Sequence, residues 1–261
     1  MYIFKNELRR NLPAAVIMGS ILGLFMVMVI SLYPTFSDEA QNIEALFGNL
    51  SGFTNIVNID LANMSSLEGF YGMEHDVLVN LSLSVFAAVV GGNMLKKEET
   101  EHTSEFLLTH PVSRIRVAIE KILAIVVILA CAGLSLYVIS YLSILITGQQ
   151  VDPLLFFNIH WVGFLLYINV GLLALGMIEL LPFKSFFTGT FIVVILYGLL
   201  IFSNLSENWE GLSWLTPFHY SSTALLIRTG AISWRYILAN FGYVAVILGL
   251  GLFRYTKRDV A

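Results

Sequence analysis

Charge is scarce in this sequence, and that scarcity excludes two broad classes of protein. Only 12% of the 261 residues are charged, against about 25% in an ordinary soluble domain. Hydrophobic residues make up 57% of the chain, and the mean hydropathy is +0.80. A water-soluble enzyme and a disordered protein both need more solvating charge than this. The composition therefore predicts an integral membrane protein.

The sequence also has few of the residues from which catalytic or metal centres are built. Its one cysteine, Cys131, lies in an apolar run, which excludes an internal disulfide and a thiol-based zinc or redox site. No two of the five histidines lie four residues apart on one helix, so we expect no metal site. The phosphate-binding loop of nucleotide hydrolases and the short signatures of zinc and serine hydrolases are absent too. We therefore expect no enzymatic activity and no cofactor bound by this chain.

Long apolar runs are what the sequence has in abundance. A hydrocarbon core of about 30 Å needs roughly 20 apolar residues per helix, and no strand-like alternation with period two competes with this pattern. The sequence therefore predicts a single transmembrane domain over residues 1–261, an all-α fold with six transmembrane helices. The predicted spans are about 12–33, 77–95, 122–146, 159–178, 186–202 and 237–253.

The basic residues predict how this domain is oriented. Lys and Arg gather on the cytoplasmic side of membrane proteins, whereas acidic residues contribute little to topology. With the N-terminus inside, 12 of the 14 basic residues fall in inner segments, and only Arg228 and Arg235 fall outside. Both termini are therefore predicted to be cytoplasmic.

Residues 1–11 precede the first predicted span. Met1, Phe4 and Leu8 recur at spacings of three and four residues, while Lys5 and Arg9 line an adjacent strip. This pattern is typical of an amphipathic helix that lies in the membrane interface. A short basic topology signal without such a helix fits the same residues.

The first outer connection, residues 34–76, is long and acidic. It has 43 residues with seven acids and no Lys or Arg, and its apolar pieces at 43–47 and 53–61 predict short helices. An acidic outer surface of this kind could attract cationic solutes. The alternative is a solvated surface that merely complements the basic inner side.

The connection 96–121 is the most distinctive inner segment. Acidic residues dominate its first half and basic residues its second, and the pair His110–Pro111 interrupts a short helix that ends at Leu108. Phe106 and Leu107 would then be exposed between charges, as a docking site for another protein requires. The alternative is a turn that lies against lipid.

Two further features of the connections and spans carry predictions. Residues 203–236 form a long outer connection rich in Trp, and we expect part of it to dip into the membrane as a re-entrant segment around Trp214, Pro217 and His219. Gly19 and Gly23 form one small-xxx-small pair in the first span, a candidate helix-packing or dimer contact.

Together these features resemble the permease subunit of type 2 ATP-binding-cassette exporters. Members of that family have an acidic stretch, a Gly-Thr pair, an acid, a Leu pair, a Pro-Val/Leu-Ser-Arg motif and a Lys that enters the third span. The corresponding positions here are Glu98, Glu99, Thr103, Glu105, Leu107, Leu108, Pro111, Val112, Ser113, Arg114 and Lys121. His102 departs from the pattern, because the family usually has Gly there. The layout of the whole chain is similar as well, and Leu215-Thr216-Pro217 loosely matches the re-entrant segment.

The resemblance implies a type 2 exporter permease fold in a prokaryotic cytoplasmic membrane. Two permeases, expected to be a homodimer, would pair around a central path, and two separate ATPase subunits would bind ATP and Mg²⁺ and dock on residues 96–118. The coupling residues it implies are Glu98, Glu99, Thr103, Glu105, Phe106, Leu107, Leu108, Pro111 and Arg114, with Pro182 and Lys184 as a second contact. No nucleic acid is expected as a partner. Among family branches, the small size and apolar interior look similar to exporters of amphipathic peptides, including the phenol-soluble modulin exporter.

Two other classes of function compete with this one. A membrane-embedded lipid transferase or protease would need a clustered polar site, and neither long connection supplies a recognisable one. A sensor or immunity protein would use the acidic outer connection to bind a cationic peptide without transport. An ATPase that co-purifies with the chain would favour the transporter.

Overall fold

The computed structural model of the chain describes residues 2–47, 66–100, 113–181 and 185–257. Every regular element in these ranges is a helix, which agrees with the predicted all-α class. The elements are α1 (Tyr2–Phe47), α3 (Leu67–Glu74), a π-helical turn η3 (His75–Val79), α4 (Asn80–Thr100), α6 (Arg114–Thr147), α7 (Pro153–Leu180), α8 (Ser185–Leu205), a 3₁₀ helix η4 (Glu207–Trp214), α9 (Pro217–Tyr220), α10 (Thr223–Thr229) and α11 (Trp234–Lys257).

Five helical segments in the described part are long and apolar enough to cross a membrane. They are Tyr2–Ser37, Leu67–Leu95, Arg114–Thr147, Pro153–Leu180 and Trp234–Lys257. The fifth predicted run lies in α8, whose apolar stretch Gly189–Leu205 is shorter. Five of the six predicted runs are thus found in helices of membrane-spanning length and composition.

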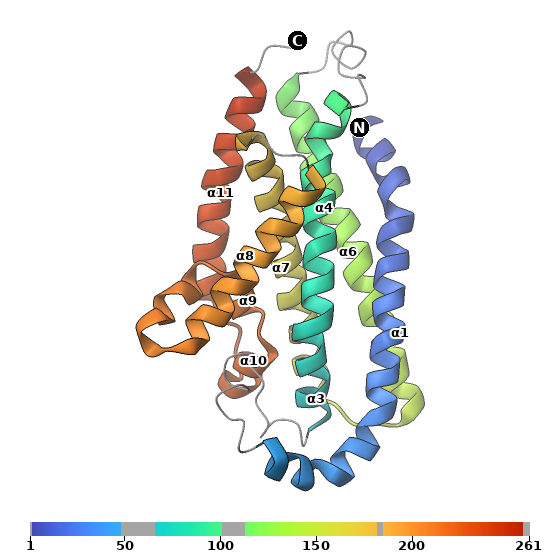
Figure 1. The fold of residues 1–261 in the computed structure, drawn as a ribbon. Coiled ribbons are helices and arrows are strands. Elements are labelled where there is room, and N and C mark those ends of the chain that lie inside the picture. Colours follow the sequence, from blue (N-terminus) through green and yellow to red (C-terminus); the bar gives the residue numbers. More distant parts are fainter. Residues whose placement is uncertain (1, 48–65, 101–112, 182–184, 258–261) are drawn as a thin grey trace.

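The long helices stand side by side in an elongated bundle, and the chain starts and finishes at the same end of it (Figure 1). Polar contacts place the start of α1, the start of α6 and the end of α11 together, because Phe4 bonds Glu120 and Arg114 bonds Tyr255. We call this the terminal end. Since α1 leaves from it and α11 returns to it, the helices between them cross the bundle in alternating directions (Figure 1).

The first helix is longer than the sequence predicts. The predicted interfacial helix 1–11 and the predicted span 12–33 lie in one continuous helix, because α1 runs from Tyr2 to Phe47 through Pro13 and Pro34. Proline removes a backbone donor and bends a helix without always ending it. Ser37, three residues after Pro34, donates its hydroxyl to the Pro34 carbonyl at 2.9 Å. Residues 2–11 are therefore the first turns of the spanning helix.

The second helical span also begins earlier than predicted. Ser66 caps α3, and its hydroxyl accepts a bond from the Gly69 N–H at 3.1 Å. The helix then passes through η3 into α4, so the segment is helical from Leu67 to Thr100. Apolar periodicity misses this start because the acids Glu68, Glu74 and Asp76 interrupt it. The predicted connection 34–76 is thus helical on both sides of residues 48–65. These residues, which include the whole predicted helix at 53–61, lie outside the described ranges.

Small residues bring the helices close together. A Cβ placed on Gly19 of α1 would overlap the backbone of Ala132 in α6, and one on Gly23 would lie 2.9 Å from the Ile139 Cβ. The predicted packing role of this pair is confirmed, but its partner is α6 of the same chain. The dimer-contact interpretation of Gly19 and Gly23 is therefore wrong, because this face is already filled. Gly91 plays the same part between α4 and α7, where its Cβ would overlap the carbonyl of Gly171.

Candidate functional site

Most of the predicted coupling residues lie outside the described residues. Glu98 and Glu99 belong to the last turn of α4, and Arg114 is the first residue of α6. The others, Thr103, Glu105, Phe106, Leu107, Leu108, Pro111, Pro182 and Lys184, fall in 101–112 or 182–184. What the structure describes is the set of helix ends that flank these two segments. Charged side chains concentrate there.

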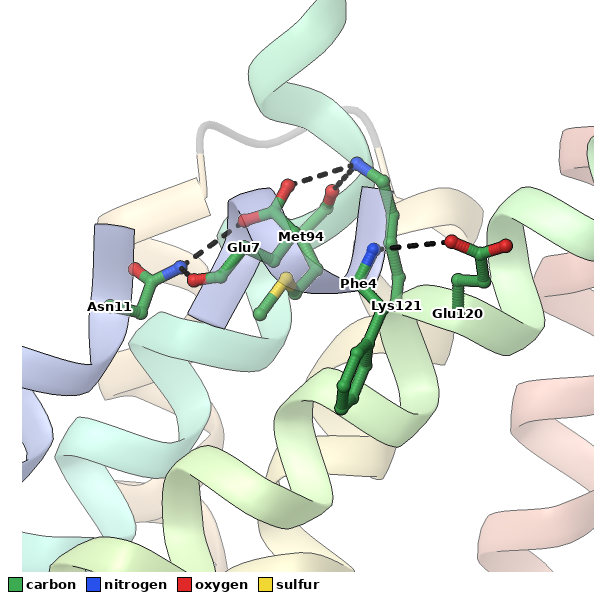
Figure 2. Close-up of polar contacts among 6 residues, drawn as sticks. All are labelled: Phe4, Glu7, Asn11, Met94, Glu120 and Lys121. Carbon is green, nitrogen blue, oxygen red and sulfur yellow. Dashed lines mark hydrogen bonds and ion pairs between the residues drawn. The ribbon is translucent and has the colours of Figure 1, made fainter. Parts of the chain in front are cut away.

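Lys121, in the second turn of α6, is the centre of this arrangement. Its side chain is fully buried, and its Nζ donates to the backbone carbonyl of Met94 near the end of α4. The same Nζ lies 3.6 Å from the carboxylate of Glu7 on α1 (Figure 2). Asn11 donates to that carboxylate at 3.2 Å and holds it in place. A buried ammonium is stable only when it is paired in this way. One side chain thus joins α1, α4 and α6.

Glu120, the preceding residue, makes a second connection between α6 and α1. Its carboxylate accepts a bond from the backbone N–H of Phe4 at 3.2 Å (Figure 2). Arg116, one turn earlier on α6, also donates to it at 3.3 Å. The first N–H groups of a helix have no partner inside the helix, and a negative charge there is favoured by the helix dipole. A carboxylate of α6 therefore caps the start of α1.

Two arginines bind backbone carbonyls at the C-terminal ends of two other helices. The Nη1 of Arg114 donates to the carbonyl of Tyr255 at 3.0 Å, in the last turn of α11. The Nη1 of Arg254 donates to the carbonyl of Leu180 at 2.8 Å, at the last residue of α7. Cations are favoured at helix C-termini, where the last four carbonyls lack partners. These bonds tie α6 to α11 and α11 to α7.

We call Glu7, Arg114, Glu120, Lys121 and Arg254 the terminal clamp. Arg114, Glu120 and Lys121 follow the segment 96–113, and Arg254 holds α7 just before the segment 181–184. The clamp therefore links the helices on both predicted coupling segments to α1 and α11. A movement of either segment would be transmitted through charged hydrogen bonds to helices that are not adjacent to it along the chain.

Sequence analysis missed most of the clamp. Lys121 enters it only through the family resemblance, and Glu7, Glu120 and Arg254 not at all. The adjacent pair Glu120–Lys121 at the start of an apolar run is a signal, since charges there need partners. Their partners Phe4 and Glu7 lie more than 100 positions earlier, however, and no spacing rule reveals them.

The predicted re-entrant residues lie at the other end of the bundle. Trp214 ends η4, and its ring centroid is 4.3 Å from that of Tyr236. Pro217 is the buried first residue of α9. The ring of His219 packs edge-on against Tyr236 at 4.6 Å, and burial together with the charge of Arg228 lowers the pKa of His219, while Glu210 opposes this. His219 is therefore a neutral packing residue at pH 7.

Polar bonds to α8, α11 and η3 hold the segment 206–233 in place. Thr216 donates to the carbonyl of Leu196 in α8 at 2.7 Å. In α11, Asn240 donates to the carbonyl of Trp214 at 3.1 Å. Asp76 of η3 accepts bonds from the N–H and the hydroxyl of Thr223, at 2.6 and 2.8 Å. The segment 206–233 is thus attached to the bundle along its length, mainly through residues that the sequence did not single out.

A third polar group lies inside the bundle between α3, η3, α4 and α7. The hydroxyl of Tyr71 bonds Nε2 of His160 at 3.0 Å, and the hydroxyl of Tyr167 donates to Asn80 at 2.9 Å. His75 is fully buried between them, and neither of its ring nitrogens has a hydrogen-bond partner. The group mixes two His with two Tyr, and no cluster of three metal-binding side chains occurs among the described residues.

The comparison with protein families identifies the family of this chain. The model of the family described as ABC-2 family transporter protein matches residues 1–260. The chain belongs to the ABC-2 transporter family. A search of curated proteins found no significant match. As an ABC-2 permease, the chain is a multi-pass membrane protein and a transporter subunit, of a kind that typically works with an ATPase subunit.

Proposed function

We propose that this chain is the permease subunit of an ATP-driven exporter in a prokaryotic cytoplasmic membrane. Two copies would form a homodimer around the path, and two ATPase subunits would bind ATP and Mg²⁺ and dock on residues 96–118, with Pro182 and Lys184 as a smaller contact. Family membership supports the transporter part of this proposal. The terminal clamp supports the docking site, because it is built around both segments.

The proposal includes six spans with both termini in the cytoplasm. A chain that leaves and returns at one end of a bundle crosses it an even number of times, and the five long apolar segments with α8 make six. Of the described basic residues, Lys121, Arg114 and Arg254 lie at the terminal end, and by the positive-inside rule this supports a cytoplasmic position for that end.

The clamp gives this permease a physical route for coupling. ATP-driven closure of the docked subunits would move the segment 96–113 and with it the start of α6. Because Glu120 and Lys121 bond α1 and α4, and Arg114 bonds α11, these helices would follow as one unit. Coupling of this kind needs elements that shift between discrete arrangements, which buried charged bonds favour over gradual deformation.

An amphipathic or hydrophobic substrate, such as a peptide, drug or lipid-like molecule, fits the chain best. Four of the spanning segments carry few charged side chains between their ends, and Asp76 on the second is bonded to Asn80 and Thr223. Ion-driven carriers usually keep ionisable residues inside the membrane for coupling. The peptide-exporter branch of the family is the specific form of this proposal.

The test is to express the chain with the ATPase encoded beside it and purify the complex through a tag on this chain. We expect the ATPase to co-purify and its hydrolysis rate in liposomes to change with added amphipathic peptides. Replacing Phe106 and Leu107 by Asp should release the ATPase while the permease stays folded. A chain that purifies without any ATPase in mild detergent, or a double variant that keeps a stable complex, would contradict the proposal.

Two acids of the outer connection make contacts that argue against the sensor alternative. Glu68 accepts a bond from the backbone N–H of Asp152 at 2.9 Å, and Asp76 is engaged by Thr223. These carboxylates stabilise the protein itself and are less available to a cationic peptide. Replacing all seven acids of residues 34–76 by Asn tests this directly: peptide binding at low salt would fall for a sensor and stay unchanged if the acids are structural.

A further inference from the structure

A small cavity lies where the π-helical turn meets α8 and the re-entrant segment. Its volume is about 20 Å³. Three neighbouring elements contribute its walls. The lining residues are Asp76, Val77, Asn80, Tyr197, Leu200, Phe218, Ser221 and Ser222.

The size of the cavity limits what it can hold. A water molecule needs at least about 10–15 Å³ and two to four polar partners, and a purely apolar cavity of this size stays dry. At about 20 Å³ the site accommodates one water molecule and nothing larger. Five of its eight lining residues are polar, so the wall contains candidate polar partners for a water molecule.

The carboxylate of Asp76 is the most polar group in the wall. It accepts bonds from the N–H of Thr223 at 2.6 Å, from the hydroxyl of Thr223 at 2.8 Å and from Nδ2 of Asn80 at 3.2 Å. An ionised carboxylate has about four acceptor positions. The side chain of Ser222 hydrogen-bonds this carboxylate as well, so its acceptor positions are already occupied by donors of the protein.

Asn80 and Ser221 supply complementary groups. The Asn80 side chain is almost fully buried, and its oxygen is used by the Tyr167 hydroxyl at 2.9 Å. An amide has two N–H donors, and the bond to Asp76 uses one of them. The Ser221 hydroxyl donates to the Phe218 carbonyl at 3.2 Å, which leaves its oxygen as an acceptor. The wall therefore offers one donor and at least one acceptor.

We propose that one ordered water molecule occupies this cavity and bridges η3 and α4 to the re-entrant segment. It accepts a bond from the second N–H of Asn80 and donates to Ser221, with its other hydrogen directed to the phenol oxygen of Tyr197. A sodium ion fits less well, because it cannot accept the Asn80 N–H and because Asp76 is already satisfied by donors. The re-entrant segment is then attached both by the direct bonds of Asp76 to Thr223 and by an exchangeable water.

Radiolytic hydroxyl-radical labelling of the full chain in lipid nanodiscs, with H₂¹⁸O as the probe, tests this proposal. Radicals formed from a bound water label the side chains beside it. We expect Tyr197 and Phe218 to be labelled, and the labelling of Tyr197 to fall at least about threefold in Ser221→Val, which fills the cavity and removes its acceptor. Ser140→Val, a substitution of a fully buried serine elsewhere in the bundle, should leave the labelling of Tyr197 unchanged.

Three results would overturn the water site: equal labelling of Tyr197 in Ser221→Val and the native chain, no labelling of Tyr197 at all, or a labelling that changes when sodium is exchanged for choline. The last result would assign the cavity to a cation. If Ser221→Val does not fold, Ser221→Thr adds a single methyl group to the same wall and is held to the same expectation. The readout needs no ATPase and no transport substrate, so it stands apart from the proposed export function.

Discussion

The carboxylate of Glu120 accepts a hydrogen bond from the backbone N–H of Phe4, a residue 116 positions earlier in the chain. This bond joins the start of α1 to the start of α6, immediately after the segment on which an ATPase would dock. Together with the adjacent contacts of Lys121, it attaches the N-terminal turns of the permease to α6, beside the proposed docking segment. The first residues of the chain are thus held by protein contacts as well as by the membrane.

Replacing Lys121 by Met should be far more harmful than replacing it together with Glu7. The single variant leaves the Glu7 carboxylate buried and unpaired, which costs about 3–5 kcal/mol of stability, whereas an apolar pair of similar volume is often neutral. Unfolding of the detergent-solubilised single and double variants measures the coupling energy. Lys257→Met, at an exposed lysine, is the matched control. Additive effects of the two substitutions would show that Glu7 and Lys121 do not act as a pair.

Gly19→Ala should destabilise the protein, while Gly133→Ala should not. A Cβ on Gly19 overlaps the α6 backbone, and overpacking of this kind costs about 1–3 kcal/mol. Nothing lies within 4 Å of a Cβ on Gly133, so there the variant should gain about 0.5–1 kcal/mol of helix stability. Thermal unfolding midpoints in one detergent decide this. Equal midpoints would mean that α1 and α6 are not in close contact at Gly19.

His75→Phe should stabilise the protein. Both ring nitrogens of the buried His75 lack partners, and leaving a buried polar group unsatisfied costs about 1–3 kcal/mol. Phenylalanine keeps the contacts with the rings of Tyr71 and His160 without that cost. His75→Ala, which removes the ring, should instead lower the unfolding midpoint. A lower midpoint for His75→Phe as well would reveal a polar partner of the imidazole in the membrane.

Asp76→Ala should loosen the re-entrant segment without unfolding the spans. It removes both bonds to Thr223, and hydrogen bonds to a charged group contribute about 1.5–3 kcal/mol. Limited proteolysis should then cut between residues 206 and 233 faster than in the native chain. Glu74→Ala, which removes a carboxylate two residues earlier in the chain, serves as the control. Unchanged cleavage in Asp76→Ala would show that Thr216 and Asn240 hold the segment without it.

The predicted spans succeed where apolar runs are unbroken and fail where polar residues have tertiary partners. The third and fourth runs lie wholly within α6 and α7. The second span was predicted ten residues too late, because Glu68 and Asp76 look like loop residues until Asp152 and Thr223 are seen to bond them. Proline also misled: Pro34 interrupts the apolar pattern but not the helix.

The functional residues divide in the same way. Trp214, Pro217 and His219 were recognised as a group from composition and a loose family match. Asp76 and Asn240 attach this segment to the bundle, but no pattern in the neighbouring sequence predicts this role. Their partners in the segment, Thr223 and Trp214, lie far from them in the sequence. Gly19 and Gly23 show the reverse case: their small size predicted helix packing, but not which helix packs there.

Composition, apolar run length and the placement of basic residues were enough to determine that this protein is a helical membrane protein, and the motif at 98–121 was enough to indicate its family. These properties are local, because each helix must satisfy its backbone within the bilayer by itself. Only the tertiary structure decided that Lys121 serves three helices, that α6 fills the glycine face of α1, and that Asp76 holds the re-entrant segment. Those contacts join residues far apart in sequence, and burial makes each of them necessary because an unpaired charge or polar group inside the bundle is too costly to keep.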